Sequence, residues 1–439
     1  MNKAITILVA AFGVASPVGA QSLPPVRQLG PVTAVAKEQT GAISAIRPLA
    51  DGRVIVNDIV GRRVLMFDST LANATVIADT TSATANAYGV QPGGLIAFRG
   101  DSTLFVDVGS LSMLLIDPFG KVARVMSAPR PQDVRFLIGG PFGNPGFDPQ
   151  GRLVYRAPPN FAAFGPPPGA GGSNGRLPQF PTLPDSAAIV RYDLATRKVD
   201  TITYFKTPKV NLNVTQTSDG GIRVINSFNP LPQGDDWALL PDGTIALVRT
   251  KDYHVDWLGQ DGKIISSPRI PFNWQRLTDE QKVAFVDSAK IAIEKQRASG
   301  TLFGGGTQQL VIGGDAGGAV RRPGGGDRAP GATVTTTTSA PAPSQLPPLT
   351  MVPPTDLPDY KPAFSPGSTR VDADGNLWIR TSENVDSRPV YDVVSRQGTL
   401  IDRVQLPANR TLVGFGAGGV AYLAVRDGAT AHLEKARVK

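Results

Sequence analysis

The sequence predicts an all-β fold made of six similar units arranged as a ring. Short apolar strands separated by turns recur along the chain, and Asp-Gly or Gln-Gly pairs join the first two strands of several units. The last recurrence has only three strands, whereas residues 26–36 form a spare strand near the amino end. Because radial arrays commonly close by letting one terminus complete the other's sheet, we expect residues 26–36 to pair with the last unit.

The first unit is the clearest, with expected strands at residues 43–49, 54–57, 63–67 and 74–78. Asp51-Gly52 between its first two strands is a strong hairpin signal. The other units begin near residues 94, 141, 237, 367 and 412. With two interruptions set aside, roughly 50 residues remain per unit, which is typical of a propeller blade. The sequence therefore predicts a six-bladed β-propeller over residues 21–271 and 364–439.

The two interruptions are residues 157–186 and 272–363. A helix is expected over 279–298, because Thr278 and Gln281 have the spacing of a capping box. Residues 299–355 are rich in Gly, Thr, Ala and Pro, and their low apolar content predicts disorder. Residues 210–228 lack the four strands of a seventh unit, so we expect them to add a hairpin to the third blade.

The amino terminus has the pattern of a cleavable signal peptide over residues 1–20. Lys3 precedes an apolar stretch over residues 4–15, and Val18 and Ala20 stand three and one residues before the expected cleavage point. No later stretch approaches the roughly 20 apolar residues of a transmembrane helix. We therefore expect a secreted or periplasmic protein.

Composition excludes several kinds of chemistry. The 439 residues include no Cys and only two His, which rules out disulfides, thiolate catalysis and a multi-histidine metal centre. The formal net charge of +8 is spread along the chain without a run of basic residues, so no nucleic acid partner is expected. We expect a monomer.

Two sequence segments carry a family resemblance. RVLMFD at residues 63–68 and DYHVDWLGQDGK at residues 252–263 follow turns in the manner of the NHL/TolB-like class of six-bladed propellers. The chain resembles this class over residues 26–271 and 364–439. The class includes lactonases, lyases and binding modules, and its lactonase-like members share a calcium site built from Glu, Asn and Asp. No such set has matching positions here, so no residue is carried over from the resemblance.

Arginines at the ends of second strands are the main candidate site residues. Four units place arginine there, namely Arg156, Arg249, Arg380 and Arg426, and the first two units place Asn57, Asp58 and Asp107 there. We expect the turns after these strands to surround the mouth of the channel, where guanidiniums would suit carboxylates or phosphates. The alternative is that each arginine pairs with a local carboxylate, such as Asp252, Glu383 or Asp427.

Two functions follow from this pattern. The first is a binding or scaffold module whose mouth, with the loop 157–186, contacts a protein or an anionic small molecule without a cofactor. The second is a lactonase-like hydrolase or lyase with a metal, calcium by the resemblance, held by Asp58 and Asp107. His254 and His432 are expected to be structural, although His254 shares a strand face with Asp256 and could pair with it as a general base.

Overall fold

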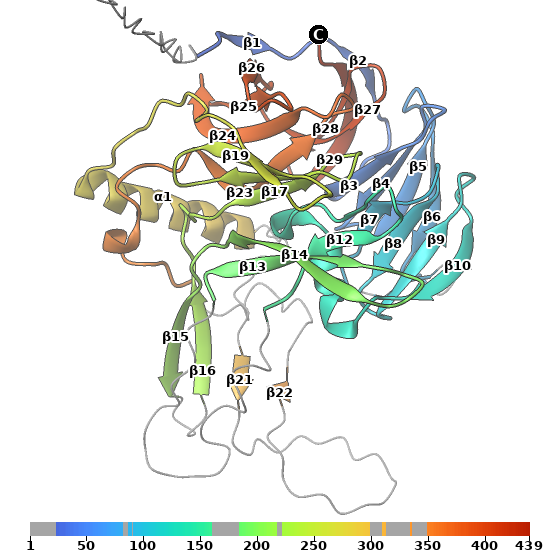
Figure 1. Ribbon diagram of the computed structural model, residues 1–439, viewed down its shortest axis with the longest axis horizontal. Helices are drawn as coiled ribbons and strands as arrows, with labels where there is room; N and C mark the ends of the chain where they lie inside the picture. The colour runs from blue at the N-terminus through green and yellow to red at the C-terminus, as the bar shows by residue number, and fades with distance from the viewer. Residues whose placement is uncertain are drawn as a thin grey trace, which may run out of the picture.

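Figure 1 shows a ring of antiparallel sheets with one long helix at its side. This computed structural model describes residues 23–81, 87–89, 91–159, 184–216, 222–298, 310–312, 334–335 and 349–439, and every structural statement below concerns these residues. The expected signal peptide and most of the interruption 157–186 lie outside them.

The described strands form six four-stranded blades, so the predicted fold is confirmed (Figure 1). The four strands of each blade are lettered A to D in the order given below, from the innermost strand, A, to the outermost strand, D. Blade 1 comprises β3 (Ile43–Pro48), β4 (Val54–Asp58), β5 (Arg63–Phe67) and β6 (Ala74–Asp79). Blade 2 comprises β7 (Gly94–Ala97), β8 (Thr103–Asp107), β9 (Ser112–Ile116) and β10 (Val122–Ser127). Blade 3 comprises β11 (Gly146–Phe147), β12 (Leu153–Arg156), β13 (Ser186–Tyr192) and β14 (Val199–Lys206).

The second half of the ring follows the same plan. Blade 4 comprises β17 (Asp236–Leu239), β18 (Ile245–Arg249), β19 (His254–Leu258) and β20 (Ile264–Ser266). Blade 5 comprises β23 (Phe364–Val371), β24 (Leu377–Val385), β25 (Arg388–Val394) and β26 (Leu400–Gln405). Blade 6 comprises β27 (Arg410–Gly416), β28 (Val420–Asp427), β29 (Thr430–Arg437) and β2 (Val32–Val35).

The hydrophobic core consists of six seams, each between two neighbouring blades. Ile55 of blade 1 and Phe105 of blade 2 share one seam, and Val56 of blade 1 and Leu433 of blade 6 share another. Because the latter joins the last blade to the first, the ring is closed. Middle strands are covered by neighbours on both faces, so Val54–Asp58 is buried at every position, and its first three residues, Val54–Val56, form a continuous apolar run.

The amino-terminal strand closes the ring, as expected. β2 pairs antiparallel with β29 and becomes the outermost strand of blade 6. Residues 26–36 are nevertheless two strands, because β1 (Val26–Gln28) pairs parallel with β26 of blade 5. The break falls at Gly30-Pro31, where a Cβ on Gly30 would come 2.6 Å from the carbonyl oxygen of Arg437. One end of the chain therefore fastens two blades.

The expected extra hairpin on blade 3 is a separate sheet. β15 (Asn211–Gln216) and β16 (Ile222–Ser227) pair with each other, and β16 pairs with β21 (Leu310–Ile312), which pairs with β22 (Val334–Thr335). Figure 1 shows this sheet below the ring. The hairpin finds its partner nearly a hundred residues away, a pairing that local sequence does not reveal.

The inserted helix α1 (Asp279–Ala298) has the predicted bounds and the predicted cap. The Thr278 N–H donates to the Gln281 side-chain oxygen at 2.9 Å, and the Gln281 N–H donates to Thr278 Oγ1 at 3.3 Å. Val286 of the helix packs with Val352 and Leu357. The expected disorder over 299–355 falls mostly outside the described residues, but its end, residues 349–355, lies against this helix.

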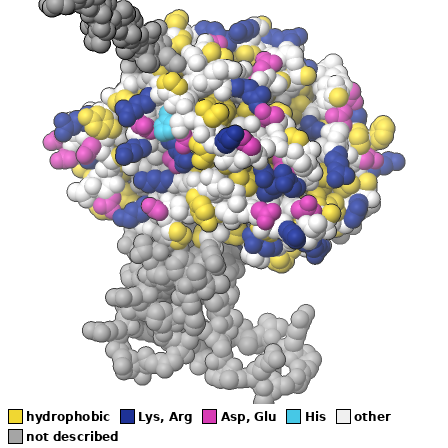
Figure 2. Space-filling view, in the orientation of Figure 1, with side chains coloured by type: hydrophobic (Ala, Val, Ile, Leu, Met, Phe, Trp, Pro, Cys, Tyr) yellow, Lys and Arg dark blue, Asp and Glu magenta, His cyan; other side chains and the backbone are white. Residues whose placement is uncertain are grey.

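Charges of both signs are interspersed over the face drawn in Figure 2. Lysine and arginine side chains alternate there with aspartate and glutamate, and hydrophobic side chains lie between them. This surface does not carry a field of one sign, so recognition of an anion needs a particular arrangement of residues rather than overall charge.

Candidate functional site

The seven residues expected at the mouth lie on the second strands of all six blades, so they surround the ring. Within the described residues, no hydrogen bond or ion pair joins two side chains of this set. Arg156 and Arg249 do share a seam. They come two residues after Val154 and Leu247, which pack together between blades 3 and 4, and alternate residues of a strand face the same side.

Asn57 and Asp58 are buried and hydrogen-bonded. Asn57 is 1% exposed, and its side-chain amide donates to Ser44 Oγ and to the Gly93 carbonyl oxygen, both at 2.8 Å. Asp58 is fully buried, and its Oδ1 accepts from the N–H groups of Gly41, Ala42 and Gly61. Both residues therefore hold blade 1 and its turns together and are out of a ligand's reach.

Asp107 has the same role in blade 2. Its Oδ1 accepts from the Gly109 N–H at 2.9 Å, and its Oδ2 accepts from the Gly89 N–H at 3.1 Å and from Ser110 Oγ at 2.5 Å. Backbone N–H groups that would otherwise be unsatisfied gain an ionised acceptor. The carboxylates expected to hold a metal are thus engaged in stabilising turns.

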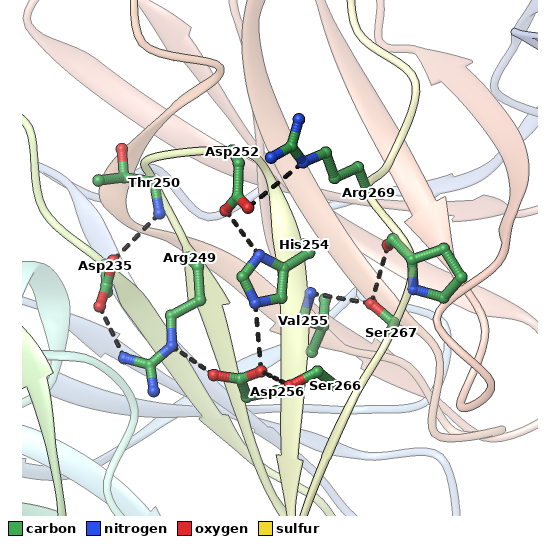
Figure 3. Close-up of polar contacts among 11 residues, drawn as sticks. Asp235, Arg249, Thr250, Asp252, His254, Val255, Asp256, Ser266, Ser267 and Arg269 are labelled. Carbon is green, nitrogen blue, oxygen red and sulfur yellow. Dashed lines mark hydrogen bonds and ion pairs between the residues drawn. The ribbon is translucent and has the colours of Figure 1, made fainter. Parts of the chain in front are cut away.

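Arg249 pairs with two carboxylates, Asp235 at 2.8 Å and Asp256 at 2.7 Å (Figure 3). Burial opposes its charge, but hydrogen bonds to Asp256 and Asp235 raise its pKa. The structure thus bears out local pairing for this arginine, although neither partner is the Asp252 that we named. Asp235 precedes strand A of its blade, and only the packing of the blade brings it to Arg249.

Arg380 and Arg426 are exposed, and neither makes an ion pair with any part of the chain that the structure describes. Arg380 is not at a turn, because β24 continues to Val385 and the chain reverses at Asp386-Ser387. The prediction that the second strand ends at Arg380 is therefore wrong. Arg426 comes one residue before the end of β28.

Arg156 differs from the other three arginines, because it is half-buried among aromatic rings. Its guanidinium carbon lies 5.7 Å from the ring centre of Phe136, 5.3 Å from that of Phe142 and 5.7 Å from that of Phe205. Nε is buried and has no hydrogen-bond partner among the described residues. Burial lowers the pKa of Arg156 to about 10, so the side chain stays positively charged at neutral pH.

The connection between blades 2 and 3 carries two of these rings. Phe136 belongs to the 3-10 helix η1 (Pro131–Leu137), and Phe142 ends η2 (Gly140–Phe142). η2 contacts β23 of blade 5, which lies opposite blade 2 in a six-membered ring, so the connection crosses the axis. Trp237 Nε1–H donates to the Phe142 carbonyl oxygen at 3.1 Å and fastens the crossing to blade 4. The connection is therefore held against innermost strands of blades 4 and 5.

His254 is held between two carboxylates (Figure 3). Its Nδ1 lies 2.7 Å from Asp252 Oδ1, and its Nε2 lies 3.2 Å from Asp256 Oδ1. The expected pairing with Asp256 is present, but the second ring nitrogen is also occupied, so neither is available to a substrate. Ser266 donates to Asp256 at 2.5 Å, and together with the bond to Arg249 this lowers the pKa of Asp256 although burial opposes it.

The described residues do not fit the metal that the second hypothesis requires. Binding calcium at Asp58 or Asp107 would displace the backbone donors that both carboxylates already accept. Within the described ranges, no three side chains among His, Asp and Glu are grouped as metal ligands. We therefore derive no chemistry through a metal.

Sequence reasoning missed the aromatic surroundings of Arg156. Phe136 and Phe142 lie in a connection that shows no strand pattern, and Phe205 lies on the outermost strand of blade 3. Two phenylalanines within a Gly- and Pro-containing connection were the only available signal, and that signal does not say which cation they face.

No protein-family model matches the sequence, and no match was found among curated proteins. Solved propellers are similar at 10–12% identity. They include a gluconolactonase from Xanthomonas campestris (12% identity, TM-score 0.34, 95% of this chain and 99% of that one). Another is virginiamycin B lyase from Staphylococcus aureus (10% identity, TM-score 0.36, 91% of this chain and 97% of that one). A third is regucalcin, a calcium-binding protein from Agrobacterium tumefaciens (12% identity, TM-score 0.39, 94% of this chain and 97% of that one). At these scores the likeness concerns the fold alone, and the NHL/TolB-like assignment stays a prediction.

In the described part of the chain, no helix is long and apolar enough to cross a membrane. The described residues do not test the expectations of a signal peptide, of export and of a monomeric state, and these stay predictions.

Proposed function

We propose that this propeller is a binding module that holds an anionic group, a carboxylate or a phosphate, against Arg156 at the seam of blades 3 and 4. The observation that carries the proposal is a half-buried guanidinium without a carboxylate partner among the described residues. The anion can belong to a small molecule or to an acidic side chain of a protein partner.

The energetics favour an added anion. A buried charge without a partner is costly, and the lowered pKa of Arg156 expresses that cost. The three aromatic rings offset part of it through cation–π attraction. A ligand carboxylate or phosphate would offset more of the cost and would accept two parallel hydrogen bonds from the planar fork of the guanidinium.

The other candidate arginines support this choice by contrast. Arg249 is already neutralised by Asp235 and Asp256. Arg380 and Arg426 are exposed, where water screens their attraction for an anion. Among the four arginines, Arg156 combines partial burial with a charge that no described carboxylate neutralises.

Isothermal titration calorimetry with inorganic phosphate and with citrate at low ionic strength tests the proposal. We expect saturable binding by the wild type, roughly tenfold weaker binding by Arg156→Ala, which corresponds to about 1.4 kcal/mol, and an intermediate loss for Arg156→Lys. Arg426→Ala removes an exposed arginine and serves as the matched control, with unchanged affinity. Equal affinities of wild type and Arg156→Ala for both anions would refute the proposal.

A further inference from the structure

A hollow of about 340 Å³ lies on blade 4, beside the turn between β18 and β19. It is lined by Lys251, Asp252, Arg269, Ile270 and Trp274. This volume is within the range of small-molecule sites. The hollow does not include Arg156, and none of its residues has a part in the function proposed above.

Trp274 presents an aromatic surface to this hollow. It is 40% exposed, whereas the other three tryptophans of the chain, Trp237, Trp257 and Trp378, are at most 8% exposed. Its ring packs edge-on against Phe272 with the centres 5.4 Å apart, and Phe272 packs in the same way against the buried Tyr253. These contacts connect the exposed ring to the buried core, and any restriction of its rotamers lowers the entropy lost when a ligand binds to it.

Polar groups at the hollow have unused hydrogen-bonding capacity. Arg269 lies 3.4 Å from Asp252 through Nε, and its side chain is 78% exposed, so the rest of the guanidinium faces solvent. Lys251 is exposed and has no ion pair with the described residues. Asp252 is positioned by His254 at 2.7 Å, and its side chain remains 30% exposed (Figure 3).

These groups define one kind of ligand. The hollow is lined by two cations, Lys251 and Arg269, and by one carboxylate, Asp252, which also contacts His254, so it has an excess of positive charge that favours an anion. The fork of Arg269 suits a carboxylate. Asp252 accepts hydrogen bonds and therefore favours hydroxyl donors. The exposed face of Trp274 favours a ring with an apolar face.

We propose that this hollow binds a sugar ring that carries a carboxylate, as in a uronic acid residue of an acidic polysaccharide. The carboxylate lies against Arg269 and Lys251, hydroxyl groups donate to Asp252, and the C–H face of the ring covers Trp274. A neutral sugar lacks the anion and a simple aromatic acid lacks the hydroxyl groups, so the site discriminates against both.

Trp274 makes the proposal measurable, because it is the one tryptophan of the chain that is substantially exposed. A trimer of galacturonic acid is titrated while tryptophan emission and quenching by acrylamide are recorded. We expect a saturable change and reduced quenching, with at least tenfold weaker binding of a neutral maltotriose and of benzoate. Added salt weakens the binding, because the carboxylate contacts are electrostatic.

Variants separate this hollow from the rest of the surface. Arg269→Ala weakens binding of the trimer at least tenfold by calorimetry, and Lys251→Ala weakens it to a smaller extent. Arg426→Ala is the matched control, and Trp274→Phe removes the fluorescence change while retaining part of the affinity. Absence of saturable binding, equal affinity for maltotriose, or an unchanged affinity in Arg269→Ala overturns the proposal. Loss of binding in Arg156→Ala would assign the trimer to the other site and likewise overturn it.

Discussion

Replacing Asp58 with alanine should strongly destabilise the propeller, because this buried carboxylate satisfies backbone groups from two turns. Three N–H groups donate to Oδ1, from Gly41 at 3.0 Å, Ala42 at 3.1 Å and Gly61 at 2.8 Å. Arg63 donates to Oδ2 at 3.2 Å. The carboxylate lies directly against the turn at Gly61, where an added Cβ would come 2.1 Å from Oδ2.

The magnitude follows from these four contacts. Each hydrogen bond to a charged acceptor contributes about 1.5–3 kcal/mol when its loss leaves a buried group unsatisfied. Gly61 is exposed and Gly41 and Ala42 are half-buried, so water recovers part of the loss. Arg63 retains its ion pair with Glu38 at 2.8 Å when Asp58 is removed, so it is not left without a partner. We expect Asp58→Ala to lower the free energy of unfolding by about 3–5 kcal/mol, and Asp58→Asn by roughly half of that.

Urea unfolding followed by circular dichroism measures this change. Asp427→Ala is the control, because Asp427 also ends a second strand but its side chain is exposed, and its effect should stay within about 0.5 kcal/mol. A loss below about 1 kcal/mol for Asp58→Ala would refute the structural role of this carboxylate. A calcium-dependent stabilisation that Asp58→Ala abolishes would refute the reasoning as well, because it would make the residue a metal ligand.

Two further predictions concern pH and the connection between blades 2 and 3. Burial raises the pKa of Asp392 to about 6, above its value in the unfolded chain, so the folded state binds this proton more tightly and loses that stability as pH rises through 6. Between pH 4 and 7 the unfolding free energy of the wild type should fall by about 2–3 kcal/mol relative to Asp392→Asn, and parallel pH profiles would contradict this. Gly143→Ala should lower the unfolding free energy by about 2–4 kcal/mol, and the melting temperature with it, because φ is 89° and a Cβ would lie 2.2 Å from Nε1 of Trp237. Gly140→Ala, with φ of 70° and no atom near the added Cβ, should have a smaller effect, and equal losses in the two variants would exclude the clash.

Local patterns were sufficient for most of the fold. The third strand of blade 1, Arg63–Phe67, and the helix Asp279–Ala298 have the bounds expected from sequence. Strand alternation and the capping box act over a few residues, so they can be read directly. Ring closure was also predictable, because an incomplete last unit and a spare first strand complement each other. The β15–β16 hairpin was assigned to the wrong sheet, since its partner comes from a distant segment.

The candidate site was only partly predictable. Repetition of the blades showed that arginine recurs near the end of the second strand, and this pattern predicted that the site binds anions. It could not separate Arg249, which Asp235 neutralises, from Arg156, which three aromatic rings surround.

Sequence alone was enough to establish the number of blades, their order and the strand that closes them, because those follow from short-range periodicity and from counting units. Tertiary structure alone decided which charges are compensated, which carboxylates are occupied by backbone N–H groups, and that the connection containing η2 reaches blade 5. The physical reason is that a charge responds to whatever lies within a few ångströms, and in a ring those neighbours come from other blades or from connections far away in the chain.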